Sequence, residues 1–198
     1  MGQGAEPLGK NISAAGGAPP DAGRLHTGAK TMNICALFGG PHKKGNTATL
    51  LENVLEGARA AGHETRRIDV AGMDIRPCKG CLACKTKQQG CVQKDDMAGV
   101  LEAVRAADIL ILASPMYWWN LAGPLKNTVD RFFSLPFYAA KETSAFAGKK
   151  LMLVMTSGQP AASDGREGLE LILKKNVRLY GHGMAGHHHS RHQRHSAG

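Results

Sequence analysis

The sequence predicts an α/β fold in which helices cover both faces of a parallel sheet. Between Met32 and Tyr180, four short apolar runs alternate with segments whose apolar residues recur at helical spacing. Short apolar runs of this length are typical of strands that are buried on both faces. The regular strand–helix alternation implies right-handed crossovers between parallel strands.

The four apolar runs are the expected strands. They lie at residues 33–38, 67–70, 109–113 and 151–155. The second run alternates apolar and polar residues, so we expect it to lie at an edge of the sheet with one face half covered.

Four apolar faces predict the helices that follow these strands. They cover residues 50–61, 97–107, 121–133 and 169–180. Gly62 is expected to end the first helix. Asp95 and Asp96 are placed to cap the second helix. Pro124 fits the first turn of the third, where a missing N–H group costs little.

The length of 198 residues suits one domain with a sizeable core. We expect residues 32–180 to form this domain, with Met32 as its natural opening. Residues 1–31 are rich in Gly, Ala and Pro and are predicted to be a disordered leader. Residues 181–198 are predicted to be a disordered, His-rich tail, and we prefer this interpretation to a transition-metal site on the tail histidines.

Composition excludes several classes of protein. The formal charge of +9 is spread along the chain, and no basic block is interleaved with aromatic residues, so we expect no nucleic-acid partner. No apolar run approaches the roughly 18 residues of a membrane span, and no secretory signal is visible, so we expect a cytoplasmic protein without a membrane partner. Four of the five cysteines lie close together, which favours metal or redox chemistry over disulfides.

The loop at residues 39–47 is the strongest indication of a binding site. It joins the first strand to the first helix, and its glycines let the backbone approach a ligand closely. Asn46 and Thr47 stand at the helix start, where free N–H groups favour an anion, and Lys43 and Lys44 add positive charge. No Gly-Lys-Ser/Thr sequence closes the loop, so a phosphate monoester fits better than a triphosphate.

Two further loops follow the third and fourth strands. Residues 114–120 hold both tryptophans of the chain, Trp118 and Trp119, which suit a wall for a planar apolar ligand. One of the pair could instead pack in the core. Residues 156–160 form the other loop. All three loops lie at the carboxyl ends of parallel strands, where open sheets bind ligands at a topological switch point.

The chain resembles the NADPH-dependent FMN reductase family, which has a flavodoxin-like fold with strand order 2-1-3-4-5. The resemblance is carried by residues 39–47, 95–97, 114–120, 125–127 and 130–131 and covers about residues 32–180. It implies an FMN phosphate site at Gly40, Pro41, His42, Lys43, Asn46 and Thr47. It also implies an isoalloxazine site at Pro115, Met116, Tyr117, Trp118, Trp119, Asn120, Ser157 and Gly158.

The same resemblance implies an oxidoreductase in which NAD(P)H passes hydride to FMN and a small-molecule or protein acceptor collects the electrons. A quinone, a free flavin or another protein would serve as acceptor. We assign no catalytic side chain, because the cofactor supplies the redox chemistry. Members commonly form dimers or tetramers, so we expect a homodimer or homotetramer.

Two departures from the family pattern are visible. The first loop usually reads Gly-Ser-Pro-Arg, whereas Gly40 and His42 stand in place of the Ser and Arg. A hydroxyl and a bidentate phosphate ligand are therefore lost. No run after Tyr180 could be a fifth strand, so residues 151–155 are expected to form an apolar sheet edge that favours dimerisation or poor solubility.

The cysteine motif leaves three interpretations open. Its members are Cys78, Cys81, Cys84 and Cys91, with spacing C-x2-C-x2-C-x6-C. The motif resembles that of the iron–sulfur flavoproteins, which carry a [4Fe–4S] cluster beside FMN. Free thiols are slightly preferred to such a cluster, and zinc comes third. Cys35, inside the first strand, is expected to be a buried apolar residue.

Two alternative functions accompany the reductase interpretation. The first is an iron–sulfur flavoprotein that carries electrons with FMN and a [4Fe–4S] cluster. The second is a non-catalytic remnant or metal-binding protein, since the phosphate loop is altered and a strand is lost.

Overall fold

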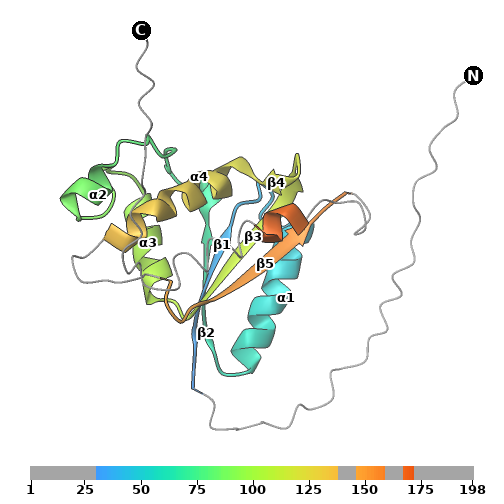
Figure 1. Ribbon diagram of the computed structural model, residues 1–198. Helices are drawn as coiled ribbons and strands as arrows, with labels where there is room; N and C mark the ends of the chain where they lie inside the picture. The colour runs from blue at the N-terminus through green and yellow to red at the C-terminus, as the bar shows by residue number, and fades with distance from the viewer. Residues whose placement is uncertain (1–29, 138–145, 159–166, 172–198) are drawn as a thin grey trace, which may run out of the picture.

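The computed structural model describes residues 30–137, 146–158 and 167–171 (Figure 1). The predicted disordered leader and tail lie outside these residues, apart from Lys30 and Thr31. Within the described parts of the chain, no helix has the length and apolar character needed to cross a membrane.

Four parallel strands form the sheet in the order β2-β1-β3-β5. They are β1 (Asn33–Phe38), β2 (Glu64–Asp69), β3 (Ile109–Tyr117) and β5 (Lys150–Thr156). A short fifth element, β4 (Asn120–Leu121), pairs antiparallel with the end of β3. The prediction of a parallel sheet is confirmed, and so is the expected order of its first four parallel strands.

Helices cover both faces of the sheet and make three layers (Figure 1). The main helices are α1 (Asn46–Ala60), α3 (Met97–Ala106) and α4 (Gly123–Arg131). Short helical turns are α2 (Ala83–Lys87), η1 (Val70–Gly72) and η2 (Phe132–Phe137). Helix α1 packs on one face, whereas α3 and α4 pack on the other, as the two separate cores show.

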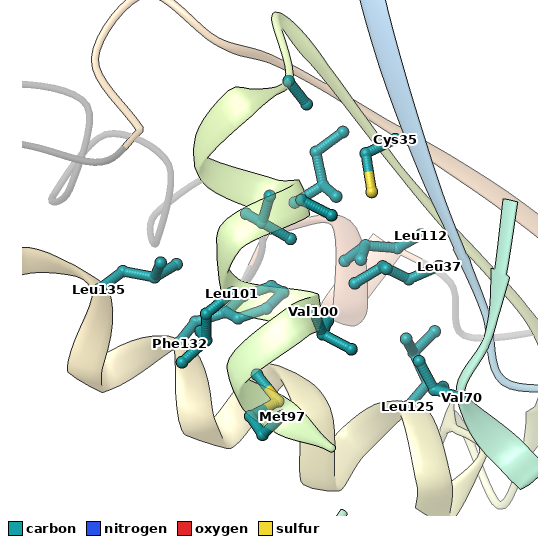
Figure 2. Close-up of a cluster of buried hydrophobic side chains, with 14 of the residues drawn as sticks. Cys35, Leu37, Val70, Met97, Val100, Leu101, Leu112, Leu125, Phe132 and Leu135 are labelled. Carbon is teal, nitrogen blue, oxygen red and sulfur yellow. The ribbon is translucent and has the colours of Figure 1, made fainter. Parts of the chain in front are cut away.

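The two cores follow from the alternation of side chains along each strand. In β1, Cys35 and Leu37 point into the larger core, whereas Ile34, Ala36 and Phe38 point into the smaller one beneath α1. Figure 2 shows the larger core, where side chains of α3 and α4 meet those of β1 and β3. Burial raises the pKa of the Cys35 thiol to about 11, in agreement with its predicted role as an apolar residue.

The structure corrects two predictions at the ends of elements. The third strand continues to Tyr117 instead of ending at Ala113, because its last two residues pair with β4. Asp96 is the N-cap residue of α3, but its side chain makes no capping hydrogen bond, whereas the Asp95 carboxylate accepts the N–H of Met97, the first helical residue, at 3.3 Å. The Asp96 carboxylate accepts the backbone N–H of Asp74 at 2.8 Å, and Asp95 is engaged mainly elsewhere.

The last predicted strand is fully described as β5, whereas the last predicted helix lies only partly within the described residues. Residues 167–171 are helical and Leu169 is buried, whereas the rest of the predicted helix lies outside the described residues. Within the described parts of the chain, β5 pairs with β3 alone. Met152 in β5 is 40% exposed, and Val154 is buried.

Candidate functional site

The carboxyl ends of β1, β3 and β5 meet at one end of the sheet. Phe38 of β1 is in register with Ala113 of β3, and Pro115 of β3 is in register with Thr156 of β5. The chain crosses from β1 to β2 on one side and then returns to β3 on the other, so β1 and β3 flank the switch point. The structure thus brings together the first two loops that were predicted to bind a ligand and the described part of the third, residues 156–158.

Two glycines let the first loop pack closely against its neighbours. A Cβ atom on Gly39 would overlap the Cβ of Leu125, at the start of α4. A Cβ atom on Gly40 would lie 2.6 Å from Cζ of Phe38. The Phe38 ring therefore occupies the space that a serine would need at position 40. The packing of Phe38 is therefore compatible with the glycine that this chain has in place of the family's serine.

The N-terminus of α1 is open to an anion. Gly45 is the cap residue, and it makes no side-chain cap hydrogen bond and no acidic residue lies in the first turn. The loop closes by a hydrogen bond from the Gly45 N–H to the His42 carbonyl, at 3.0 Å. His42, Lys43 and Asn46 are exposed beside this terminus. Free N–H groups, the helix dipole and the charge of the exposed Lys43 favour a phosphate here.

Thr47 ties the first loop to the third. Its side chain is buried, and its Oγ1 lies 2.5 Å from Oγ1 of Thr156, at the end of β5. Either hydroxyl can be the donor. When Thr156 donates, the hydroxyl hydrogen of Thr47 is free for another acceptor. Ser157 and Gly158 follow directly and are exposed.

Arg67 braces the first loop from β2, a role that the sequence analysis missed. Its guanidinium lies 4.7 Å from the centroid of the Phe38 ring, and Nη2 donates to the Lys43 carbonyl at 3.5 Å. Nε donates to Asp69 at 2.7 Å, and Glu52 lies 3.7 Å from Nη1. Because two carboxylates neutralise it, Arg67 holds the loop in place and leaves the binding of an anion to the exposed cations.

The two tryptophans form the turn of a hairpin, which corrects the expectation of an open loop. Tyr117 of β3 pairs with Asn120 of β4, and Trp118 and Trp119 are the two residues between them. Their φ angles are 50° and 56°, a region that suits Gly or Asn and strains bulky residues. Neither packs in the core, because Trp118 is 89% exposed and Trp119 is 56% exposed. The rings form a T-shaped pair with centroids 5.3 Å apart.

The base of this hairpin is held by a buried hydroxyl. Oγ of Ser114 donates to the Pro115 carbonyl at 2.7 Å and accepts the Ala122 N–H at 2.8 Å. Met116, between this anchor and the turn, is half-buried, whereas Tyr117 is exposed. The structure therefore presents two aromatic rings on a fixed support beside the ends of β1 and β5.

The four clustered cysteines line a single small cavity of about 30 Å³. Their segment turns sharply, with positive φ angles at Gly80, Leu82, Gln88 and Gly90. Cys84 is buried. Burial raises the pKa of its thiol, and the nearby Cys91 and Cys78 also raise it, while backbone N–H groups act in the opposite direction.

The number and arrangement of the cysteine thiols decide which metal group they could bind. No three His, Cys, Asp or Glu side chains in the described residues are close enough to share a single metal ion. A [4Fe–4S] cluster places one thiolate on each of its irons, so its ligands lie farther apart around one cavity. Four free thiols around one cavity fit this ligand set.

A buried ion pair lies under the cysteine cavity, and the sequence analysis missed it. Nη1 and Nη2 of Arg131 donate to the Asp95 carboxylate at 2.8 and 3.1 Å. The side chains are 1% and 0% exposed. Asp95 also accepts the Arg76 N–H at 3.2 Å. Both residues lie in stretches that carried the family resemblance, which was the only signal in the sequence for this pairing.

The sheet order and the gathering of its loops at the switch point define a flavodoxin-like fold with a candidate phosphate site. The chain belongs to the NADPH-dependent FMN reductase family, whose model matches residues 32–176.

Several relatives are named iron–sulfur flavoproteins. One from Archaeoglobus fulgidus is 40% identical over 100 residues, which cover 50% of this chain and 48% of that protein. One from Methanosarcina thermophila is 38% identical and covers 50% and 52%. MJ0731 from Methanocaldococcus jannaschii is 30% identical over 72% of this chain and 68% of its own length. The chain thus matches about half the length of the first two relatives.

Solved structures show the same fold. The apo form of the NADH:FMN oxidoreductase EMOB matches with a TM-score of 0.53 and 29% identity, over 72% of this chain and 68% of that chain. RosB with a bound riboflavin-phosphate derivative matches with a TM-score of 0.60 and 17% identity, over 77% and 61%. The second likeness supports the fold alone.

Proposed function

We propose that the chain is an FMN-dependent NAD(P)H oxidoreductase that passes electrons to a quinone, a flavin or a protein acceptor. The observation that carries this proposal is the junction of three strand ends, where an open helix N-terminus lies beside a rigid aromatic hairpin. Membership of the family and the printed names of the relatives support it.

The proposal assigns the FMN phosphate to the N-terminus of α1. Backbone N–H groups of the first turn would bind it, with Asn46 and Thr47 as hydrogen-bond donors. His42 and Lys43 would supply charge in place of the arginine that the family usually has. Gly40 would let the backbone approach the phosphate, because it carries no side chain, and Pro41 would lie beside it in the loop.

The isoalloxazine ring is assigned to the space between the hairpin and the end of β5. Pro115 to Asn120 would form one side, and Ser157 and Gly158 the other. Bound FMN would supply the hydride acceptor. The chain's own contribution is to hold the ring and limit access to it, since Trp118 and Trp119 stand on a fixed turn.

An anaerobic absorbance spectrum of freshly purified protein tests the proposal. Flavin bands are expected in the protein fraction, either from cofactor bound on purification or after addition of FMN and removal of unbound flavin by desalting, and NADPH or NADH should bleach them. A protein that is colourless after this treatment would favour the non-catalytic alternative.

We infer as a second candidate an electron carrier that holds FMN together with a [4Fe–4S] cluster. The favouring observation is the convergence of Cys78, Cys81, Cys84 and Cys91 on one cavity. The relatives named iron–sulfur flavoproteins support it. After anaerobic reconstitution with iron and sulfide, we expect a broad absorbance near 400 nm that dithionite bleaches, and about four irons per chain for this cluster type. A chain that retains FMN but no iron would leave only the first function.

A further inference from the structure

Arg131 is a buried cation with one nitrogen that has no hydrogen-bond partner. Its Nη1 donates to Asp95 and to the Arg76 carbonyl, at 2.8 and 2.7 Å, and its Nη2 donates to Asp95. Its Nε is buried and has no hydrogen-bond partner. A buried donor without a partner costs about 1–3 kcal/mol, so the fold gains if a ligand supplies the acceptor.

The unpaired donor belongs to a side chain that lines the cysteine cavity. Arg131 shares this cavity with all four clustered cysteines. Burial lowers the pKa of Arg131, but its hydrogen bonds to Asp95 and the negative charge of that carboxylate raise it above its ordinary value. Arg131 and Cys91 both line the cavity, so their side chains face the same space.

We propose that Arg131 is a positioning residue of the cysteine site, whose Nε–H donates to sulfur held there, either Cys91 Sγ or a bound inorganic sulfide, and so raises the reduction potential of the site. The inference rests on the second proposed function, the cluster. Reduction by an electron donor such as dithionite adds one electron to the cluster and makes its sulfurs more negative. No bond is broken in this step. A charge-assisted hydrogen bond then stabilises the reduced form more than the oxidised form.

Asp95 fixes the direction of this donor. Its carboxylate binds both terminal nitrogens of the guanidinium and also accepts the backbone N–H groups of Arg76 and Met97. The guanidinium is planar, so two bonds to one carboxylate also fix the plane in which Nε–H points. The negative charge of Asp95 balances the positive charge of Arg131. The main effect of Arg131 on the cavity is therefore its directed Nε–H hydrogen bond.

The first test compares reduction potentials in the full-length, reconstituted chain. R131K keeps a cation beside Asp95 but lacks the Nε–H of the fork. We expect its one-electron reduction equilibrium to fall about tenfold, which corresponds to 59 mV. The potential is followed by the electron paramagnetic resonance signal of the reduced cluster. R59K is the matched control, because Arg59 forms an exposed pair with Glu52 on α1, and it should leave the potential unchanged.

The second test needs no substitution and covers the case in which R131K fails to fold. Wild-type protein is labelled with [15N]arginine, reconstituted and reduced, and the pulsed resonance spectrum is examined for coupling of an arginine nitrogen to the cluster. Such a coupling is expected, and its absence would overturn the inference. A potential that R131K leaves unchanged would also overturn it. If wild-type protein incorporates no iron, the cluster proposal fails, and this inference fails because it depends on the cluster.

Discussion

The packing of Phe38 against Gly40 limits which side chains position 40 of the phosphate loop can hold. The Phe38 ring fills the space that a side chain at position 40 would need, and Arg67 covers the same ring from β2. A side chain at position 40 would therefore have to displace a large, buried aromatic residue two positions earlier. Restoring the serine alone should not restore a phosphate ligand.

Gly40→Ser is expected to destabilise the protein by about 1–3 kcal/mol, since it overpacks the loop against Phe38. FMN affinity should fall instead of rise. Thermal unfolding and fluorescence titration with FMN measure the two effects. Gly57→Ser is the control, because a Cβ at Gly57 meets nothing within 4 Å and serine is a better helix former than glycine. An unchanged melting temperature for Gly40→Ser would contradict the packing argument.

Asp95 should make the stability of the protein depend on pH in acid. Burial alone would raise the pKa of this carboxyl, but Arg131 and backbone N–H groups hold it below its usual value. A lowered pKa in the folded state means that the stabilisation is present above about pH 4, the unfolded value, and is lost as pH falls through the folded value.

Asp95→Asn tests this dependence. We expect it to lower the free energy of unfolding by about 3–5 kcal/mol at neutral pH, because it leaves the buried Arg131 without its counter-charge. The difference from wild type should shrink as the pH falls below about 4. Urea unfolding between pH 3 and 7 measures it, and Asp130→Asn, in an exposed pair with Lys126, is the control. A constant difference over this range would refute the assignment.

At the scale of elements, the hairpin of β3 and β4 combines strain with exposure. Trp118 and Trp119 both have left-handed backbone conformations, which cost non-glycine residues about 1–2 kcal/mol each. An Asn-Gly turn would adopt this backbone conformation with less strain, so the two exposed aromatic residues do not increase the stability of the fold. Such strain is typical of functional sites.

Replacing Trp118-Trp119 by Asn-Gly should therefore stabilise the protein and weaken the flavin site. We expect the free energy of unfolding to rise by about 1–3 kcal/mol and FMN affinity to fall. Urea unfolding of the FMN-free protein and FMN titration give the two values. Tighter or unchanged FMN binding would exclude the hairpin from the flavin site.

The sequence predicted elements better than it predicted contacts. The four parallel strands, the helix start at Asn46 and the meeting of three loops follow from local patterns and from the rules of parallel sheets. The hairpin was missed because β4 has only two residues. The bracing by Arg67 and the Asp95–Arg131 pair join segments far apart in the chain, and no local periodicity reports such contacts.

At the scale of the whole molecule, the exposed side of β5 bears on self-association. Met152 is 40% exposed on a strand that pairs with β3 alone among the described residues. Apolar edge strands are ready templates for pairing with another chain. The expected homodimer or homotetramer would cover this region.

Met152→Lys should shift the protein toward the monomer, because a charge on an edge strand opposes pairing. Light scattering coupled to size-exclusion chromatography measures the mass at several concentrations. Leu50→Lys is the matched control, since Leu50 is also an exposed apolar residue, but on α1. A wild-type protein that is monomeric at all concentrations would refute the association through β5.

The Asp95–Arg131 pair also constrains how this chain can change over evolutionary time. Losing either charge alone would cost about 3–5 kcal/mol, a large part of the 5–15 kcal/mol that typically separates folded from unfolded protein. A single replacement at either position is therefore strongly destabilising, and only the replacement of both residues together avoids this loss of stability. A descendant that lost its cysteines would still keep both charges. We therefore expect the acid and the base to be retained for stability whether or not the cysteines beside them are retained.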